Sequence, residues 1–371
     1  MRKTYKYRIY LTNGQRRILN TMLEECRWVY NQTLQAREFA YEHSIKCGLY
    51  DTQAMLPSWK TVRPSLKLVH AQVLQNVQVR VDLAFQAFFR RQKQGEKEVG
   101  YPRFKGFGRY DSITYPQYGN GVRIAGDDLI VSKIGRVKVI WHRPVDGAIK
   151  TVTLRRSASG KWYVTFSCEI ERRPYPPSAN VVGIDVGLES FLTTSSGEKV
   201  ENPRFLRRDE TDLKRVQSAK DKAKIEQNWP ENHRRKKALH RIHERIAFRR
   251  ADFAHQISRQ LVRHYQIIAF EELNVANMLK NHRLAKSIAD VAWKQLIEYT
   301  CAKAEEAGRT VVLVKPRNTS KKCSRCGELV DKDLSVRMHE CPSCGLVLER
   351  DQNVAVNILR LGLQSLEAQR L

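Results

Sequence analysis

The sequence lacks any apolar run close to the roughly 18 residues of a transmembrane helix. Its first residues, MRKTYKYRIYLTNGQRR, are basic and have no apolar core, so they do not resemble a secretory signal. Internal repeats, low-complexity tracts and the phosphate-binding pattern G-x-x-x-x-G-K-[ST] are also absent. The absence of a transmembrane run and of a secretory signal predicts a soluble intracellular chain with no membrane partner.

Acidic residues are also scarce, with 39 Asp and Glu against 66 Lys and Arg, which gives a formal net charge of +27. An excess of this size opposes compaction unless a polyanion neutralises it, so nucleic acid is the predicted partner class. A disordered basic tail is excluded, because 42% of the residues are hydrophobic and 9% aromatic. The length of 371 residues favours two or three domains.

The N-terminal half predicts a small β-barrel that is interrupted by helices. Residues 4–10 alternate as a strand, and Thr12 with Gln15 forms a capping-box pattern that opens a helix. A second helix is expected over about 68–92, with a connector at 47–66 that contains prolines. Short strands separated by glycine-rich turns then dominate from about 110 to 172.

The C-terminal half predicts an α/β domain. RRPYPPSAN at 172–180 contains three prolines and marks a linker. Strands alternate with helices after it: NVVGIDVG, ESFLTTSSGEKV, YQIIAFEEL and RTVVLVK are strands, and a long amphipathic helix spans 239–261. Further helices are expected at about 286–307 and over DQNVAVNILRLGL.

Four of the eight cysteines form the pattern C-x2-C-x14-C-x2-C, at Cys323, Cys326, Cys341 and Cys344. Two such turns bring four thiolates around one Zn²⁺, and an all-cysteine set predicts a closed, structural site. Nearby His339 is expected to be a bystander. The remaining cysteines, Cys26, Cys47, Cys168 and Cys301, are expected to be buried apolar residues in a reducing compartment.

Three acidic residues stand where a metal nuclease would need them. Asp185 lies inside an apolar strand, where a carboxylate is costly unless it faces a cation or a hydrogen-bond donor. Glu271 ends the strand IIAFE, and Asp351 starts the last helix, although helix capping alone could explain that position. Together the three could hold two Mg²⁺ ions about 4 Å apart. The adjacent Glu272 is expected to point the other way.

The combined motifs GIDVG, FEELNV, TSKKCSRCG…CPSCG and RDQNVAVNI resemble the TnpB family, over about 181–360. TYKYRIYLT, AFQAFFRR and YPRFKGFG extend the resemblance to the N-terminal half. TnpB proteins are transposon-encoded RNA-guided DNA nucleases related to type V CRISPR effectors. The resemblance implies a prokaryotic cytoplasmic protein associated with the nucleoid, with guide RNA and target double-stranded DNA as partners.

The fold implied is an α+β multidomain chain. A wedge-like β-barrel would span 1–12 and 96–173, with a helical recognition insertion at 13–95 and a linker at 174–180. A RuvC domain of RNase H-like fold would follow at 181–317 and 349–371, with a zinc-ribbon-like insert at 318–348 that helps to load the DNA strand. By the same resemblance, Asp185, Glu271 and Asp351 would be the metal-binding catalytic triad.

Candidate nucleic-acid contacts lie in three places. Gln72 and Asn76 share a polar helix face and, with Thr114 and Tyr115, could by resemblance recognise a short target-adjacent motif. Basic and aromatic residues alternate in YPRFKGFGRY, which holds two further candidates, and RRKKALHRIHERIAFRR could follow an RNA backbone. In each case ordinary solvated residues are the alternative. The basic candidates are Arg103, Lys105, Arg234, Arg235, Lys236 and Lys237.

The leading hypothesis from the sequence is therefore an RNA-guided, Mg²⁺-dependent endonuclease that cuts DNA with one RuvC centre. In that reading the guide supplies sequence specificity by base pairing. One alternative is a catalytically inert, zinc-bearing nucleic-acid-binding protein, such as a repressor or transposition accessory factor. Another is an actin-like ATPase, because GIDVG also opens that superfamily's phosphate-binding hairpin, although no second phosphate loop follows.

Overall fold

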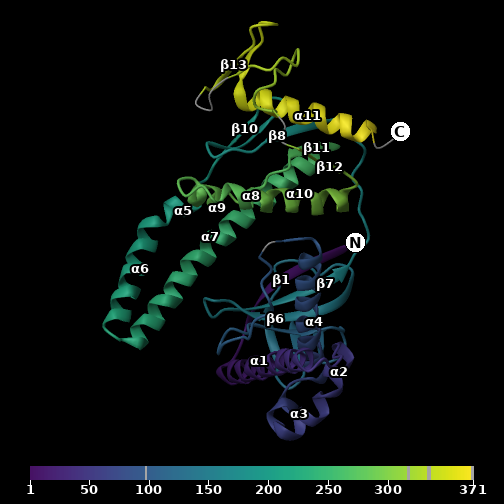
Figure 1. Cartoon of the computed structure of the whole chain (residues 1–371), viewed down its shortest axis with the longest axis vertical. Helices are drawn as coiled ribbons and strands as arrows, with labels where there is room; N and C mark the ends of the chain where they lie inside the picture. The colour runs from purple at the N-terminus through teal and green to yellow at the C-terminus, as the bar shows by residue number, and fades with distance from the viewer. Residues whose placement is uncertain (97, 316–317, 332–335, 369–371) are drawn as a thin grey trace. The chain divides into compact units, whose positions relative to one another are not determined.

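The computed structural model describes residues 1–96, 98–315, 318–331 and 336–368. The chain divides into two units, Met1–Ile170 and Glu171–Leu371. Each unit is built around its own β-sheet (Figure 1). Within the described residues, no helix is long and apolar enough to cross a membrane.

Seven antiparallel strands form the sheet of the N-terminal unit, in the order β2-β6-β7-β1-β5-β4-β3. Strand β1 is central in this sheet and pairs with β5 on one side and β7 on the other. The sheet is nearly closed, which confirms the predicted barrel in this coarser form. The bounds are β1 Arg2–Tyr10, β2 Ser112–Tyr115, β3 Val122–Ala125, β4 Asp128–Val131, β5 Gly135–Ile140, β6 Ala148–Arg156 and β7 Trp162–Glu169.

Two long helices pack on this sheet, α1 (Asn13–Glu42) and α4 (Ala71–Lys93). The predicted capping box opens α1: the Thr12 hydroxyl accepts from the backbone N–H of Gln15, and the Gln15 side chain accepts from the N–H of Thr12. Helix α4 begins close to its predicted start. Both helices bury an apolar stripe in one core with the sheet.

The connector predicted at 47–66 does join α1 to α4, and it is largely helical. It forms α2 (Leu49–Ala54), α3 (Leu56–Val62) and the 3₁₀ helix η1 (Pro64–Leu68). Prolines suggested a loop, but they stand in the first turns of α3 and η1. The amide missing from proline has no partner within the helix at that position, so a proline there is compatible with helix formation.

The C-terminal unit contains a five-stranded sheet in the order β10-β9-β8-β11-β12. The first three strands form an antiparallel meander, and β11 then adds parallel to β8, and β12 parallel to β11. The predicted alternation of strands and helices in this half is confirmed, except that ESFLTTSSGEKV, predicted as one strand, folds back on itself as β9 and β10. The bounds are β8 Val181–Asp185, β9 Ser190–Thr194, β10 Lys199–Glu201, β11 Ile267–Glu271 and β12 Thr310–Val314.

Helices cover both faces of this sheet (Figure 1). Side chains alternate along a strand, so Ile268 and Phe270 of β11 face the core shared with α7 and α10, while Ala269 faces α11. Helices α6 and α7 run side by side as a long hairpin that extends from the sheet (Figure 1). The bounds are α5 Phe205–Arg208, α6 Glu210–Ile225, α7 Trp229–His264, α8 Val275–Met278, α9 Ala285–Val291, α10 Trp293–Ala307 and α11 Arg350–Ala368.

The single helix predicted at 286–307 was wrong, because two helices occupy this segment. Ala292 adopts the left-handed conformation, with φ of 56°, and separates α9 from α10. All the surrounding residues are compatible with a helix, so the apolar periodicity did not reveal the break. The turn lets Asp290 of α9 and Trp293 of α10 both enter the interior of the unit.

The proline-rich segment at 172–180 has no regular structure, yet it is attached to the C-terminal unit. The backbone N–H of Tyr175 donates to the Ala307 carbonyl at 2.9 Å, and the buried Arg309 donates to the Pro176 carbonyl at 2.9 Å. The predicted linker is therefore extended and docked. Its division from the flanking domains at 174 and 180 remains a prediction.

Candidate functional site

Two of the predicted acidic residues end neighbouring parallel strands. Phe270 of β11 pairs with Ile184 of β8. Glu271 directly follows Phe270 and Asp185 directly follows Ile184, so both acidic residues lie at the same edge of the sheet. The carboxyl ends of parallel strands are where open α/β sheets bind ligands. The backbone of the sheet thus brings together two carboxylates that are 86 residues apart in the sequence.

Helix α11 brings the third acidic residue, Asp351, to the same edge. The helix packs directly on β8 at Gly183. There is no room for a side chain at this position, because an added Cβ would lie 2.1 Å from the Ala355 carbonyl oxygen. Asp351 is one helical turn before Ala355, and Asp185 is two residues after Gly183. Close packing at one glycine therefore determines where the first turn of the helix lies.

The three carboxylates line one cavity of about 900 Å³. Glu272 is exposed and lies outside its lining, in agreement with the predicted side-chain direction. Four arginines also face the cavity, so its wall carries both signs of charge. The lining residues include Asp185, Glu189, Glu271, Asp290 and Asp351, with Arg204, Arg207, Arg337 and Arg350, and with Thr319, Ser320 and Trp293.

The electrostatics of the cavity favour a bound cation. Burial, together with the neighbouring carboxylates of Asp351 and Glu271, raises the pKa of Asp185 to about 8, against weaker opposing effects from Arg350 and the Val186 amide. Burial also raises the pKa of Glu271, and a hydrogen bond from Thr319 partly opposes this. Oxygen ligands that repel one another in this way fit a hard divalent cation such as Mg²⁺.

The carboxylates are spaced more widely than a closed metal cage. Within the described residues, only the four cysteines form a group of three or more whose ligand atoms all lie within 4.8 Å. Arg350 donates from Nε and Nη2 to Asp351 Oδ1, at 3.0 and 2.9 Å. A cation that binds here would compete with this guanidinium. The metal-binding role of the triad therefore remains a prediction.

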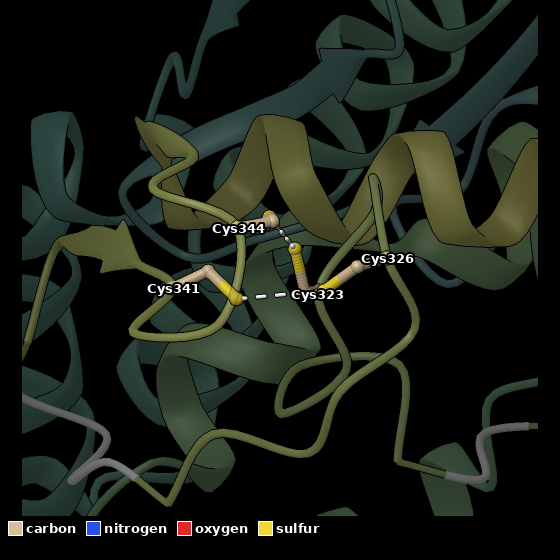
Figure 2. A group of neighbouring side chains, drawn as sticks. All are labelled: Cys323, Cys326, Cys341 and Cys344. Atoms are coloured by element: carbon tan, nitrogen blue, oxygen red, sulfur yellow. Dashed lines mark hydrogen bonds between the residues drawn. The ribbon is translucent and has the colours of Figure 1, made fainter.

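The four cysteines do converge as the spacing predicts (Figure 2). The Sγ atoms of Cys323 and Cys344 are 3.6 Å apart, and those of Cys326 and Cys341 are 3.5 Å apart. Gly327, in the left-handed region, donates its amide to the Cys323 carbonyl at the end of the first turn. Four sulfur ligands in a tight cluster fit a structural Zn²⁺. The short hairpin β13 (Met338–Glu340) and β14 (Val347–Glu349) supports the second turn.

His339 has a role that the sequence analysis missed. Its side chain is fully buried in β13 and hydrogen-bonds to Cys323. Burial raises the pKa of Cys323, but hydrogen bonds from the backbone amides of Cys326 and Arg325, and then from His339, outweigh it and lower the pKa, which favours the thiolate. His339 thus stabilises the thiolate of Cys323 and is not itself one of the four clustered ligands. In the sequence, the only signal of this contact was the position of His339 two residues before Cys341, and that spacing does not say where the side chain points.

The candidate motif-recognition residues lie on α4 and β2. Gln72 donates to Gln117 at 2.8 Å, and Asn76 accepts from Arg80 at 3.2 Å. Arg80 also donates to the Thr114 hydroxyl at 2.5 Å, so α4 and β2 are joined through one guanidinium. Tyr115 is only 1% exposed and packs in the core.

The basic candidates are exposed or nearly so. Arg103 is exposed, and Lys105 is fixed to α1, since its backbone N–H donates to Asn31 at 2.8 Å. On α7, Arg234 and Arg235 both pair with Glu231, whereas Lys236 and Lys237 are exposed further along the helix. The distances from Arg234 and Arg235 to Glu231 are 2.8 and 2.6 Å.

Family models match three parts of the chain. One described as "Probable transposase" matches residues 165–282, and one described as "Cas12f1-like, TNB domain" matches residues 293–358. A model described as "Helix-turn-helix domain" matches residues 1–46. In that segment the structure forms the strand β1 and the single helix α1.

Two relatives match almost the whole chain. A "Putative RNA-guided DNA endonuclease" of Streptomyces pristinaespiralis is 34% identical, over 98% of this chain and 90% of its own. The chain belongs to the TnpB family. A "Putative RNA-guided DNA endonuclease InsQ" of Escherichia coli strain K12 is 30% identical, over 91% of this chain and 86% of its own. These matches confirm the resemblance that the motifs of this TnpB protein indicated.

A solved structure shows the same fold. The chain of the "Cas12f1-sgRNA-target DNA complex" superimposes with a TM-score of 0.60, at 12% identity, and the match covers 96% of this chain and 98% of that one. At this identity the likeness concerns the fold alone. It confirms a mixed α/β multidomain architecture.

Proposed function

We propose that this TnpB protein is an RNA-guided, Mg²⁺-dependent DNA endonuclease with a single RuvC-like centre. The observation that carries the proposal is the convergence of Asp185, Glu271 and Asp351 on one cavity, at the carboxyl ends of β8 and β11 and the start of α11. The meander followed by two parallel strands supports an RNase H-like assignment for this unit. The relatives named as RNA-guided DNA endonucleases support the reaction class.

The three carboxylates would hold one or two Mg²⁺ ions, which supply an activated water and stabilise the leaving oxygen in phosphodiester hydrolysis. Arg207 lines the same cavity and is suited to orient phosphate groups of the strand to be cut, whereas Arg337 is paired with Glu189. Arg350 holds Asp351 in the absence of a cation and keeps its carboxylate facing the cavity. One centre of this kind would cut both DNA strands in succession.

Guide RNA and target double-stranded DNA are the proposed partners. The net charge of +27 supplies contacts to phosphates, which carry affinity without sequence information. The nearly closed sheet with α1 and α4 would act as wedge and recognition parts, and Gln72, Asn76 and Thr114 are proposed to contact the target-adjacent motif. The cysteine cluster would be a zinc-bearing insert beside the cleft.

The deciding experiment compares wild type with Asp185→Asn on guided DNA. RNA that co-purifies with the protein would be sequenced, and cleavage of DNA matching its variable end would be measured with Mg²⁺. We expect a defined RNA and cleavage by wild type that is lost in Asp185→Asn. The control is Asp252→Asn, an exposed carboxylate on α7 that accepts a hydrogen bond from Gln256.

The alternative function has its own outcome in the same experiment. Heterogeneous RNA and no cleavage by wild type, in protein that retains its zinc, would identify an inert zinc-bearing nucleic-acid-binding protein. Equal cleavage by wild type and Asp185→Asn would move the reaction to another centre.

A further inference from the structure

Two buried asparagines of α11 hold the first cysteine turn. Asn353, fully buried, accepts from the backbone N–H of Ser324 at 2.9 Å and donates to the Lys322 carbonyl at 2.9 Å. These two backbone groups stand on either side of Cys323. One side chain of the helix thus fixes the backbone around one of the four thiols.

Asn357, one turn further along α11, extends the same attachment. Its Nδ2 donates to the Lys322 carbonyl at 2.7 Å and to the Thr319 carbonyl at 3.0 Å. Asn357 is 3% exposed, so these bonds are made out of water. Leaving such a buried group without a hydrogen-bond partner is destabilising. The segment from Thr319 to Ser324 is therefore held along α11 by side-chain amides.

Thr319, at the start of this segment, reaches the acidic cavity. It is 6% exposed and lines the cavity together with Glu271 and Ser320, where its side chain partly opposes the effect of burial on the pKa of Glu271. The side chain of Thr319 therefore shares the cavity with Glu271, while its carbonyl accepts from Asn357. The residue connects the cysteine turn to one of the three carboxylates.

We propose that Thr319 is a positioning residue for Glu271, and that Asn357 and the cysteine turn determine where Thr319 lies. This inference rests on the proposed function, because it assigns Glu271 to the metal-binding carboxylates. In this arrangement α11 orients two carboxylates of the centre, Asp351 directly through its first turn and Glu271 through Asn357 and Thr319. The cysteine cluster then contributes to the geometry of the centre in addition to any contact with DNA.

The alternative is that these hydrogen bonds only attach an insert to its domain. In that case the asparagines would affect stability and zinc content, and the Thr319 hydroxyl would have no effect on the carboxylate site. The two possibilities differ in what removal of a single hydroxyl should do. Thr319→Val removes it at nearly constant shape, and Thr319→Ser keeps it.

The test measures Mn²⁺ binding by electron paramagnetic resonance on the full chain, in wild type, Thr319→Val and Thr319→Ser. Mn²⁺ prefers oxygen ligands over thiolates, so it reports on the carboxylates. Asp185→Asn identifies the signal of that site. We expect Thr319→Val to keep one zinc per chain and its melting temperature, and to bind Mn²⁺ about ten-fold more weakly, as is typical for outer partners of metal ligands. Thr319→Ser should restore binding.

The role of Asn357 is tested by a double-mutant cycle. Asn357→Ala should weaken Mn²⁺ binding, and Thr319→Val in that background should add little, because both act on one connection. Mn²⁺ affinity in Thr319→Val equal to that of wild type, with zinc and stability intact, would overturn the role of Thr319. Fully additive losses would overturn the connection through Asn357.

The outcome also separates this inference from the proposed function. If wild type binds Mn²⁺ in an Asp185-dependent manner but cuts no guided DNA, the proposed function fails, and the affinities of the Thr319 variants still decide the inference. If wild type shows no Asp185-dependent Mn²⁺ binding, both fail together.

Discussion

At Asp185, burial and two neighbouring carboxylates act in the same direction and raise the pKa to about 8. The unfolded value is close to 3.8, so the folded protein binds a proton that the unfolded chain releases over this range. The resulting stabilisation is complete below about pH 3.8 and is lost as the pH rises towards 8. A bound cation would replace the proton.

The first prediction follows from this loss of stability with rising pH. In magnesium-free buffer the melting temperature of wild type should fall relative to Asp185→Asn as the pH rises from 5 to 8, because only wild type must bury a charge at position 185. Mg²⁺ should raise the melting temperature of wild type at pH 8 and leave the variant unchanged. Differential scanning fluorimetry measures both changes in melting temperature. No chelator is added, because it would also remove zinc from the four cysteines. Parallel pH profiles for the two proteins would contradict the prediction.

Gly183 carries the second prediction. A Cβ at this position would lie 2.1 Å from the Ala355 carbonyl oxygen and 2.7 Å from the Leu359 amide, both backbone atoms of α11. Gly183→Ala should lower the free energy of unfolding by about 1–3 kcal/mol or more and displace Asp351 with its helix. Urea denaturation monitors the loss. Gly100→Ala is the control, since its Cβ would meet no atom within 4 Å.

Individual residues differ in how well the sequence predicts them. Asp185 was predictable because a carboxylate among valine, isoleucine and glycine needs a reason to be there. Thr319 and Asn357 were not, because polar residues near a cysteine turn or on a helix are common. What distinguishes them is their partners, Glu271 and the backbone of the turn, and only the packing of α11 brings these together.

Among the helices, α9 is held by one buried carboxylate. Asp290 accepts from Arg250 of α7, at 3.0 and 2.6 Å, and from the backbone N–H of Leu206 in α5, at 3.0 Å. The Asp290 side chain is 7% exposed and that of Arg250 is 22% exposed. One residue thus joins three helices at the wall of the acidic cavity.

The third prediction concerns this contact. Asp290→Ala should cost about 3–5 kcal/mol of stability, because it leaves a partly buried guanidinium without its partner. The double replacement Asp290→Ala with Arg250→Met should recover part of that loss. Chemical denaturation measures both, with Asp252→Ala as the exposed control on α7. A loss below 1 kcal/mol for Asp290→Ala would show that packing alone holds α9.

At the level of elements, periodicity predicted the type of most helices and strands but not their interruptions. It placed the strands of the first sheet, most strands of the second and the long helix within α7, but it merged β9 and β10 into one strand. It merged α9 with α10, since no proline or glycine marks the break at Ala292. Ala292 lies between two buried side chains, Asp290 and Trp293, and their burial is a tertiary feature that a local pattern does not contain.

For the molecule as a whole, the net charge of +27 favours association with polyanions. Composition alone predicted this, as the motifs predicted the family. The distribution of the charge is a property of the fold: on α7, Arg234 and Arg235 share Glu231, while Lys236 and Lys237 are exposed one step further along. Paired arginines have less free charge to offer a phosphate than exposed lysines.

The last prediction uses this difference. Replacing Lys236 and Lys237 by glutamate should weaken RNA binding at every salt concentration and flatten its salt dependence, because each lost phosphate contact removes about 0.7 from the slope of log K against log salt for a single strand. Filter binding between about 50 and 200 mM salt measures the slope. The matched control carries the same change of charge at Lys46, in a loop, and at Lys294, on α10, both exposed and outside α7. Equal slopes in the two double variants would mean that net charge, and not the position of these lysines on α7, determines how the protein holds RNA.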